Sequence, residues 1–370
     1  MKLTKNYQFK NLKISLIVLV LAISTIGILV VGSAKPSYQG KQIMGVVLGV
    51  IAMLVVSMID YNWLLNLSWI MYAVNVILLV LVKLIGKEVN GAQRWIDLKV
   101  ISVQPSDLTK IFMIIFFAKF LMDHEEDLNE PKNIIKAILL ILPSLILIVA
   151  QPNLSNTICV ATLFCVLMFI GGLSYKFIRN VLLIAVPLVV IFLVIAVQPN
   201  QKLLKPYQQK RILSWLEPDK YADQEAYQQI NSLMAIGSGQ ATGKGLNNQG
   251  STSVKNGNFI SEPQTDFIFA IIGEELGFVG CCITIILLLL IVIQCIIIGT
   301  KAQNLAGQII CGGVAALIGI QSFINISVAT RIFPNTGIPL PFVSYGLTSL
   351  VTFFIGIGLV LNVGLQPKKY

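Results

Sequence analysis

Long apolar runs separated by short polar segments extend over most of the chain. Three of these runs, 134–150, 281–299 and 350–363, are nearly free of charged residues. A membrane-spanning helix needs about 20 predominantly apolar residues, and within lipid a helix satisfies its own backbone hydrogen bonds. The pattern therefore predicts ten transmembrane helices, which cover residues 11–32, 41–59, 64–84, 105–122, 134–150, 155–173, 177–197, 264–299, 303–329 and 339–364.

The predicted fold class is an all-α polytopic integral membrane protein. It has one transmembrane domain over residues 1–370 and one large extracytoplasmic loop over residues 198–263. The first run is interpreted as an anchor and not as a cleavable signal peptide, because further spans follow it at once. The eighth span, 264–299, is too long for one straight crossing and is expected to extend beyond the bilayer.

The composition agrees with a membrane protein and excludes several kinds of catalytic site. Charged residues make up 12% of the chain, about half of the ~25% that is typical of soluble domains. The single histidine, His124, lies in a predicted cytoplasmic loop, so a Ser-His-Asp triad and an HExxH zinc site are both excluded. The cysteines lie inside apolar runs without CxxC spacing, which is typical of packing residues; they are Cys159, Cys165, Cys281, Cys282, Cys295 and Cys311.

The basic residues predict the orientation of the spans. With both termini in the cytoplasm, the inner short loops and helix ends carry twelve Lys and Arg residues, and the outer ones carry eight. The long loop 198–263 adds seven basic residues on the outside. An outer face this basic indicates an anionic substrate that is handled there.

Two polar groups lie before and at the start of the fourth span. Arg94 could form a bidentate contact with phosphate, and the adjacent Trp95 is either an interfacial aromatic residue or a functional one. Asp107 and Lys110 are three residues apart, so they share a helix face. They are either functional charges or a structural ion pair, because charges at membrane depth are costly.

The long loop contains Arg211 and a glycine-rich stretch that holds Lys244. Six glycines lie between residues 237 and 257. Such a backbone can approach a ligand closely and present its amide groups to an anion. The alternative is a flexible loop, although a loop of this length outside the membrane usually has a function.

Two carboxylates lie at the predicted outer mouth of the bundle. Pro263 indicates a helix start, which would place Asp266 in the first turns of the eighth span and Glu262 on the same face. The helix dipole would favour ionised Asp266, whereas partial burial would raise its pKa. The pair could provide a general base or bind a divalent cation such as Mg²⁺ or Mn²⁺; the alternative is helix capping.

Seven sequence blocks together resemble the SEDS family of bacterial wall proteins (RodA, FtsW and SpoVE). They are GAQRWI at 91–96, QPSDLTK at 104–110, QPNLSNT at 151–157, AIGSG at 235–239 with GKG at 243–245, EPQTDFIFAIIGEELG at 262–277, Asn325, and TGIPLPFVSYG at 336–346. The resemblance extends almost from end to end of the chain, and the blocks around Asp266 and Tyr345 are the most specific.

The resemblance implies a peptidoglycan glycosyltransferase in the bacterial cytoplasmic membrane. Such proteins polymerise lipid II, a disaccharide-pentapeptide on undecaprenyl pyrophosphate, in cell elongation, division or sporulation. The implied partners are a class B penicillin-binding protein, lipid II and membrane lipid, with no nucleic acid. By resemblance, Asp266 matches the essential aspartate of the family and Trp95 its functionally important tryptophan. The alternatives are a lipid II flippase and a non-catalytic activator of a penicillin-binding protein.

The residues themselves favour Asp266 as the general base, with a substrate site around it. The acceptor sugar hydroxyl needs a base, and no histidine is predicted on the outer side. We expect the pyrophosphate to be bound by positive charge from Arg94, Arg211, Lys244 or a divalent cation. Lys110, Trp95 and Glu262 complete the predicted substrate-binding set.

Several positions depart from the family pattern. Asn153 replaces the usual aspartate, Asp107 replaces a glutamate, Ser261 replaces a proline and Leu347 replaces a glycine. The loss of charge at Asn153 argues against a carboxylate role at that position.

Overall fold

The computed structural model describes residues 7–89, 92–97, 102–198, 201, 206–221, 226–248, 257 and 259–367. Several parts of the predicted loop 198–263 therefore lie outside the described residues, namely 199–200, 202–205, 222–225, 249–256 and 258.

A long helix is present at each of the ten predicted spans. Within the described residues they are α1 (Ile14–Ala34), α2 (Pro36–Ser57), α4 (Ser68–Ile85), α5 (Pro105–Asp123), α6 (Pro131–Ala150), α7 (Leu154–Ile170), α8 (Tyr175–Val197), α11 (Ile268–Gly299), α12 (Leu305–Ala329) and α13 (Leu347–Leu365). Seven of them are long and apolar enough to cross a membrane by length and composition alone, and α7 is a shorter apolar helix.

Shorter elements connect these helices. They are η1 (Phe9–Asn11), α3 (Tyr61–Asn66), α9 (Pro206–Leu216), η2 (Pro218–Tyr221), α10 (Tyr227–Ser238), β1 (Lys87–Val89), β2 (Ala92–Asp97) and β3 (Ser102–Val103). The strands form an antiparallel sheet in the order β1-β2-β3. This small sheet was not predicted, because its strands are short and do not alternate clearly between polar and apolar residues.

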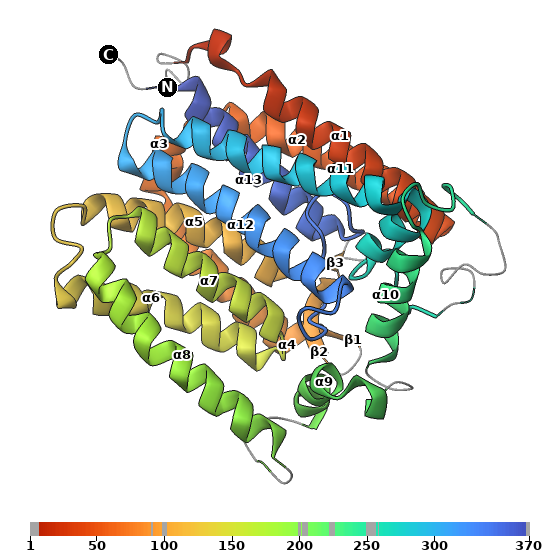
Figure 1. Cartoon of the computed structure of the whole chain (residues 1–370). Coiled ribbons are helices and arrows are strands. Elements are labelled where there is room, and N and C mark those ends of the chain that lie inside the picture. Colours follow the sequence, from red (N-terminus) through yellow and green to blue (C-terminus); the bar gives the residue numbers. More distant parts are fainter. Residues whose placement is uncertain are drawn as a thin grey trace.

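The bundle has two distinct ends. The helix α1 begins and α13 ends at one end, which we call the termini end, whereas β2, α9 and α10 lie at the other, which we call the sheet end (Figure 1). At the termini end the backbone N–H of Gln8 donates to the Leu365 carbonyl at 3.0 Å. Ten long helices that alternate in direction bring the chain back to the end where it started. The beginning and the end of the described chain therefore lie side by side.

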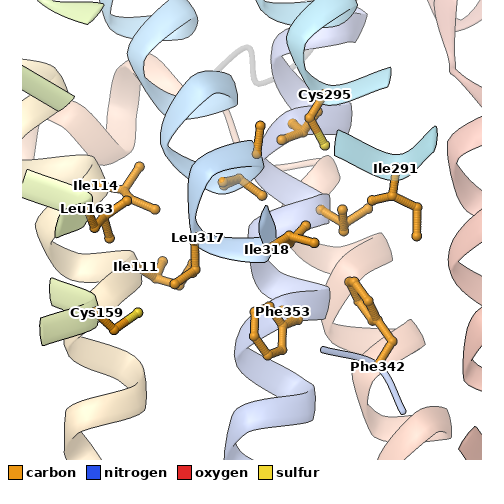
Figure 2. Close-up of a cluster of buried hydrophobic side chains, with 14 of the residues drawn as sticks. Ile111, Ile114, Cys159, Leu163, Ile291, Cys295, Leu317, Ile318, Phe342 and Phe353 are labelled. Carbon is orange, nitrogen blue, oxygen red and sulfur yellow. The ribbon is translucent and has the colours of Figure 1, made fainter. Parts of the chain in front are cut away.

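Helices α5, α12 and α13 are the most buried, and the core surrounds them. Side chains from five helices meet in one apolar cluster, among them Ile114 of α5, Leu163 of α7, Ile291 of α11, Leu317 of α12 and Phe353 of α13 (Figure 2). The six cysteines are free thiols, and four of them are buried: Cys159, Cys281, Cys295 and Cys311. The prediction that the cysteines are packing residues is confirmed for these four, whereas Cys165 is exposed and Cys282 is half-buried.

The predicted eighth span is interrupted. Gly277 has φ 66° and ψ −163°, so α11 consists of two helical segments joined by a break. The loop after α10 satisfies the backbone there, since the N–H groups of Phe278 and Val279 donate to Gln240 and Ala241 at 2.8 and 3.1 Å. Irregular backbone at membrane depth is tolerated where protein surrounds it in this way. The length of the run therefore reflects a break and not one straight helix.

Two predicted helix starts were too early. The structure begins α11 at Ile268 and α13 at Leu347, not at 264 and 339. Residues 261–267 and 336–346 form turns and irregular segments. The prediction that Asp266 and Glu262 share a helical face was therefore wrong, and Glu262 has a positive φ of 52°. The first start was placed too early because Pro263 was interpreted as a helix-start signal, although residues 261–266 are mostly polar. In 336–346 the apolar residues Ile338, Leu340, Phe342 and Val343 pack in the protein interior, which hydropathy alone cannot distinguish from a span.

Candidate active site

Asp266 lies in the turn just before α11, and its backbone is fixed by residues distant in sequence. Asn325 of α12 donates from Nδ2 to the carbonyl of Asp266 at 2.9 Å and to that of Ile338 at 2.7 Å. The Ser344 hydroxyl donates to the Thr265 carbonyl at 2.6 Å. The backbone N–H of Tyr345 donates to Gln264 at 2.8 Å. The segment 336–346 therefore holds the turn that carries Asp266.

The carboxylate of Asp266 has two arginines and one acid in its surroundings. It is half-buried, and desolvation raises its pKa to about 6, against the opposing effect of Arg211 and Arg94, with a further upward contribution from Glu262. Gly337 lies against it with φ 68°, and a Cβ there would be 3.1 Å from Asp266 Oδ2. The arrangement therefore combines a half-buried carboxylate with the positive charge of two arginines.

Arg94 is positioned by the strand β2 at the sheet end. Its Nε donates to the Gln151 carbonyl at 3.2 Å, and its Nη2 contacts the Pro152 carbonyl. These contacts hold the guanidinium at the turn between α6 and α7. Trp95 is the next residue of the strand and is half-buried, and consecutive strand residues point to opposite faces of a sheet.

Arg211 approaches the same region from α9. Its Nη1 donates to the Asn335 carbonyl at 3.4 Å, and its side chain is exposed. Trp215, one helical turn later, donates from Nε1 to the carbonyls of Arg331 and Ile332 at 3.3 and 3.2 Å. Both contacts attach α9 to the segment that follows α12. Arg94 and Arg211 are thus the two predicted cations that the fold brings to Asp266.

Lys110 has a different environment from that expected of a ligand-binding residue. Its Nζ donates to Asp107 Oδ1 at 2.8 Å and to Gln321 Oε1 at 3.2 Å. The Lys110 side chain is only 1% exposed. Of the two alternatives for this pair, the geometry supports the structural ion pair.

Lys244 and the glycine-rich stretch pack against α11. The Lys244 Nζ lies 2.9 Å from Glu274 Oε1. Backbone N–H groups of Lys244 and Gly245 donate to the carbonyls of Glu274 and Glu275 at 3.0 Å each. A Cβ on Gly239 or Gly243 would collide with the α11 backbone. In the described residues these glycines allow close helix packing, which corrects the expectation that these backbone amides are presented to an anion.

Glu262 lies at the edge of the site. Its carboxylate forms an ion pair with Lys35 at 3.7 Å, and its side chain is 60% exposed. It also accepts a contact from Gln264 Nε2. It acts electrostatically on Asp266 and contacts the corner between α1 and α2.

A polar network behind the site accounts for one departure from the family pattern. Asn153 caps α7 by accepting from the Asn156 N–H. Its Nδ2 donates to Ser106 Oγ at 3.3 Å. The same hydroxyl accepts from the amides of Asn156 at 3.0 Å and Gln104 at 3.1 Å. Because a carboxylate cannot donate, asparagine provides a contact here that the usual aspartate could not.

Two other departures are also accommodated by local contacts. Ser261 accepts a hydrogen bond from the side-chain amide of Gln228, which a proline could not do. Leu347 begins α13 and lies over Gly45 of α2, where an added Cβ would be 3.3 Å from the Leu347 methyl group.

Sequence reasoning missed the residues that position Asp266. Asn325 was recognised only as part of a resemblance, and Gly337 and Ser344 only as letters within a motif. Asn325 carried a usable signal, since a buried asparagine in an apolar helix is costly unless it has a specific partner. Its two acceptors lie on other segments, so the partners themselves required the structure.

The chain is similar to known proteins over nearly its full length. Residues 5–369 match the FtsW/RodA/SpoVE family, described as cell cycle protein. Peptidoglycan glycosyltransferase MrdB of Escherichia coli (strain K12) is 33% identical, over 96% of this chain and 94% of the relative. Stage V sporulation protein E of Bacillus subtilis (strain 168) is 33% identical, over 94% of this chain and 95% of the relative.

Two solved structures have the same fold. One belongs to a peptidoglycan synthase complex that coordinates polymerization and crosslinking; it has a TM-score of 0.79 and 28% identity, covering 97% of this chain and 98% of that one. The other is the rod shape determining protein RodA of Thermus thermophilus, with a TM-score of 0.71 and 24% identity, covering 99% of each chain. With the family match extending over residues 5–369, this protein belongs to the SEDS family of RodA, FtsW and SpoVE proteins.

Proposed function

We propose that this protein is a peptidoglycan glycosyltransferase that polymerises lipid II, with Asp266 as its general base. The observation that carries the proposal is the half-buried Asp266 carboxylate with Arg94 and Arg211 acting on it. Relatives that are themselves named peptidoglycan glycosyltransferases support the reaction class. The enzyme belongs in the membrane because its substrate is a long-chain lipid.

In the proposed reaction Asp266 accepts the proton of the acceptor sugar 4-hydroxyl as that oxygen attacks the donor anomeric carbon. A C–O bond forms, and the bond between the anomeric carbon and the donor pyrophosphate oxygen breaks. The lipid pyrophosphate leaves with the bonding electron pair, and Arg94 and Arg211 are placed to stabilise its charge. A positioned base contributes about 10²–10⁴-fold to such a rate.

A divalent cation is a separate, testable component. The described residues contain no group of three or more His, Cys, Asp or Glu side chains that could hold a metal ion. Mg²⁺ is, however, often bound by one or two carboxylates together with substrate phosphates, and Asp266 and Glu262 are the carboxylates at the site. When bound, the cation would neutralise pyrophosphate charge. Removal with EDTA, followed by Mg²⁺ or Mn²⁺, measures whether it is needed.

The position of the buried charges supports a polymerase over a flippase. Lys110 and Glu275 lie about 8 and 11 Å from the sheet ends of their helices, at ~1.5 Å per residue. A flippase is expected to place charge at the midplane and open on both sides. A non-catalytic activator would have no need for a fixed base between two arginines.

We infer that the sheet end faces outward and that both termini are cytoplasmic. The basic bias of the short loops supports this orientation. We also propose a class B penicillin-binding protein as partner, because the chain is similar to a protein from a synthase complex that coordinates polymerization with crosslinking.

The decisive experiment is Asp266→Asn in purified protein, alone and with its partner, supplied with lipid II. We expect glycan polymer to fall by about 10²–10⁴-fold, because the amide cannot accept the proton. Expression, lipid II binding and partner binding should persist. Asp219→Asn, which removes an exposed carboxylate on η2, is the matched control and should keep its rate. Near-native turnover by Asp266→Asn would overturn the assignment and make Glu262 the next candidate.

A further inference from the structure

A second group of positive charges lies at the sheet end, at the corner between α1 and α2. Lys35 follows the last residue of α1, and Lys41 lies near the start of α2. Their ammonium groups lie 4.9 and 5.3 Å from the centroid of one ring, that of Tyr38. Tyr345 packs against Tyr38 edge-on at 4.6 Å.

The charge of this corner is only partly balanced by carboxylates of the described residues. The carboxylate paired with Lys35 is Glu262, at 3.7 Å, and both side chains are largely exposed. For Lys41 no carboxylate lies within ion-pair distance among the described side chains. An exposed cation–π contact contributes only about 0.5–1 kcal/mol. Two ammonium groups around one ring therefore favour an anion, and phosphate suits lysine as a point charge.

Below Lys41 the surface is apolar. Exposed side chains at i, i+3 and i+4 spacing follow α2 away from the corner: Met44, Val47, Leu48, Ile51 and Leu54. A basic, aromatic corner directly above an apolar helix face matches an amphiphile with an anionic head group and a long hydrocarbon tail. Other spans also present exposed apolar side chains, so the position of the two lysines next to this face, and not the face alone, favours a lipid-linked anion.

The corner is joined to the active site by two contacts. Tyr345 donates its backbone N–H to Gln264, in the turn that carries Asp266. Glu262 pairs with Lys35 and also acts electrostatically on Asp266. The side chain of Glu262 thus connects the corner to the proposed base.

We propose that Lys35, Tyr38 and Lys41 form a second pyrophosphate subsite, which binds the acceptor lipid-linked disaccharide. The inference rests on the proposed function. The donor pyrophosphate leaves from the reacting carbon and belongs beside Arg94 and Arg211. The acceptor reacts through the hydroxyl of its outer sugar, so its pyrophosphate must lie one disaccharide away from Asp266. Its lipid tail would then follow the exposed face of α2.

The test compares Lys35→Gln, Lys41→Gln and the double variant in initial-rate assays over a range of lipid II concentrations. We expect KM for lipid II to rise about tenfold for a single variant, the loss expected of one charge-assisted hydrogen bond. The assays are run well above pH 6, where Asp266 stays ionised when Glu262 loses its partner Lys35. There kcat should stay within about twofold, since Asp266 and its arginines are untouched. Lys132→Gln removes an exposed lysine at the start of α6, away from the site, and is the matched control.

A second measurement separates substrate from bulk lipid. Assays are repeated in vesicles of phosphatidylcholine alone and in vesicles containing phosphatidylglycerol. A higher KM in both kinds of vesicle supports the subsite, whereas a change only in the response to phosphatidylglycerol overturns it. Direct binding of lipid II is also measured with the inactive Asp266→Asn protein. Adding the double lysine change to this protein must weaken that binding, in parallel with the rise in KM. Unaltered KM in an active enzyme refutes this inference alone, while a wild-type protein that makes no polymer refutes the proposed function.

Discussion

The ion pair between Lys244 and Glu274 provides a sharp test of how the base is positioned. Glu274 lies in the segment of α11 between Asp266 and the break at Gly277. The pair, with the backbone bond from Lys244 to the Glu274 carbonyl, attaches this segment to the loop after α10. We predict that Lys244→Met lowers both stability and kcat, and that adding Glu274→Gln restores much of the loss.

The magnitudes follow from the unequal burial of the two side chains. Glu274 is 1% exposed, whereas Lys244 is 18% exposed. Lys244→Met removes the ammonium partner of a buried carboxylate, which costs about 3–5 kcal/mol. Glu274→Gln leaves an ammonium that can turn towards water, so its cost should be about 1 kcal/mol, near that of an ordinary hydrogen bond. The double variant should resemble Glu274→Gln.

Thermal unfolding can be followed with a fluorogenic thiol reagent, because four native cysteines are buried and become reactive on unfolding. The apparent Tm should fall most for Lys244→Met and least for Glu274→Gln. Turnover of lipid II is measured on the same samples. We expect kcat to follow the order of Tm while KM stays nearly constant, since Lys244 acts through the helix that follows Asp266.

Two outcomes would refute this reasoning. If Lys244→Met raised KM without lowering Tm, Lys244 would bind substrate, as its place in a basic loop first suggested. If Glu274→Gln failed to restore the Lys244→Met variant, the pair would not be the contact that matters. Lys220→Met is the matched control, because its partner Glu217 is 45% exposed and such surface pairs contribute little.

Three further predictions address the base, the orientation and the partner. Burial raises the pKa of Asp266 to about 6, and the base must be ionised, so kcat/KM should fall on acidification through about pH 6. Glu262→Gln should move this acidic limb of the pH profile to lower pH, and Arg211→Gln should move it to higher pH. An acidic limb at the same pH in the wild-type protein and both variants would contradict the assignment. In a cysteine-free background, an impermeant thiol reagent on intact cells should label Asp219→Cys and spare Glu126→Cys; the reverse pattern would invert the topology. Purification in mild detergent should recover a single-span class B penicillin-binding protein, and repeated recovery of this chain alone would count against that partner.

Much of the architecture was predictable from hydropathy. Each of the ten predicted spans corresponds to a helix, because an apolar run of membrane length has few other stable states in lipid. Four of the six cysteines were correctly interpreted as packing residues, since none occurs in a polar loop. Asp266 was singled out as the candidate base because the single histidine lies in a predicted cytoplasmic loop and because the resemblance matches Asp266 to the essential aspartate of the family.

Tertiary structure decided which basic residues lie near Asp266 and which form ion pairs with other carboxylates. Arg94, Lys110, Arg211 and Lys244 look alike in sequence, as basic residues near polar turns. The fold places two of them at Asp266 and pairs the others with Asp107 and Glu274. The spacing of Asp107 and Lys110 already offered their ion pair as one of two alternatives, whereas the partner of Lys244 lies 30 residues away in the chain and is set by helix packing.

The same reason explains the glycine-rich stretch and the broken helix. The sequence predicted that another group approaches these glycines closely, but it did not predict that this group is the backbone of α11. Hydropathy also predicted one continuous span over 264–299, since the residues around a buried helix break are as apolar as those of a lipid-facing helix. Contacts such as Ser33 to Glu275, 242 residues apart in the chain, form only when distant helices pack. Local sequence determines whether a residue prefers lipid or water, whereas only the packed bundle determines its partner.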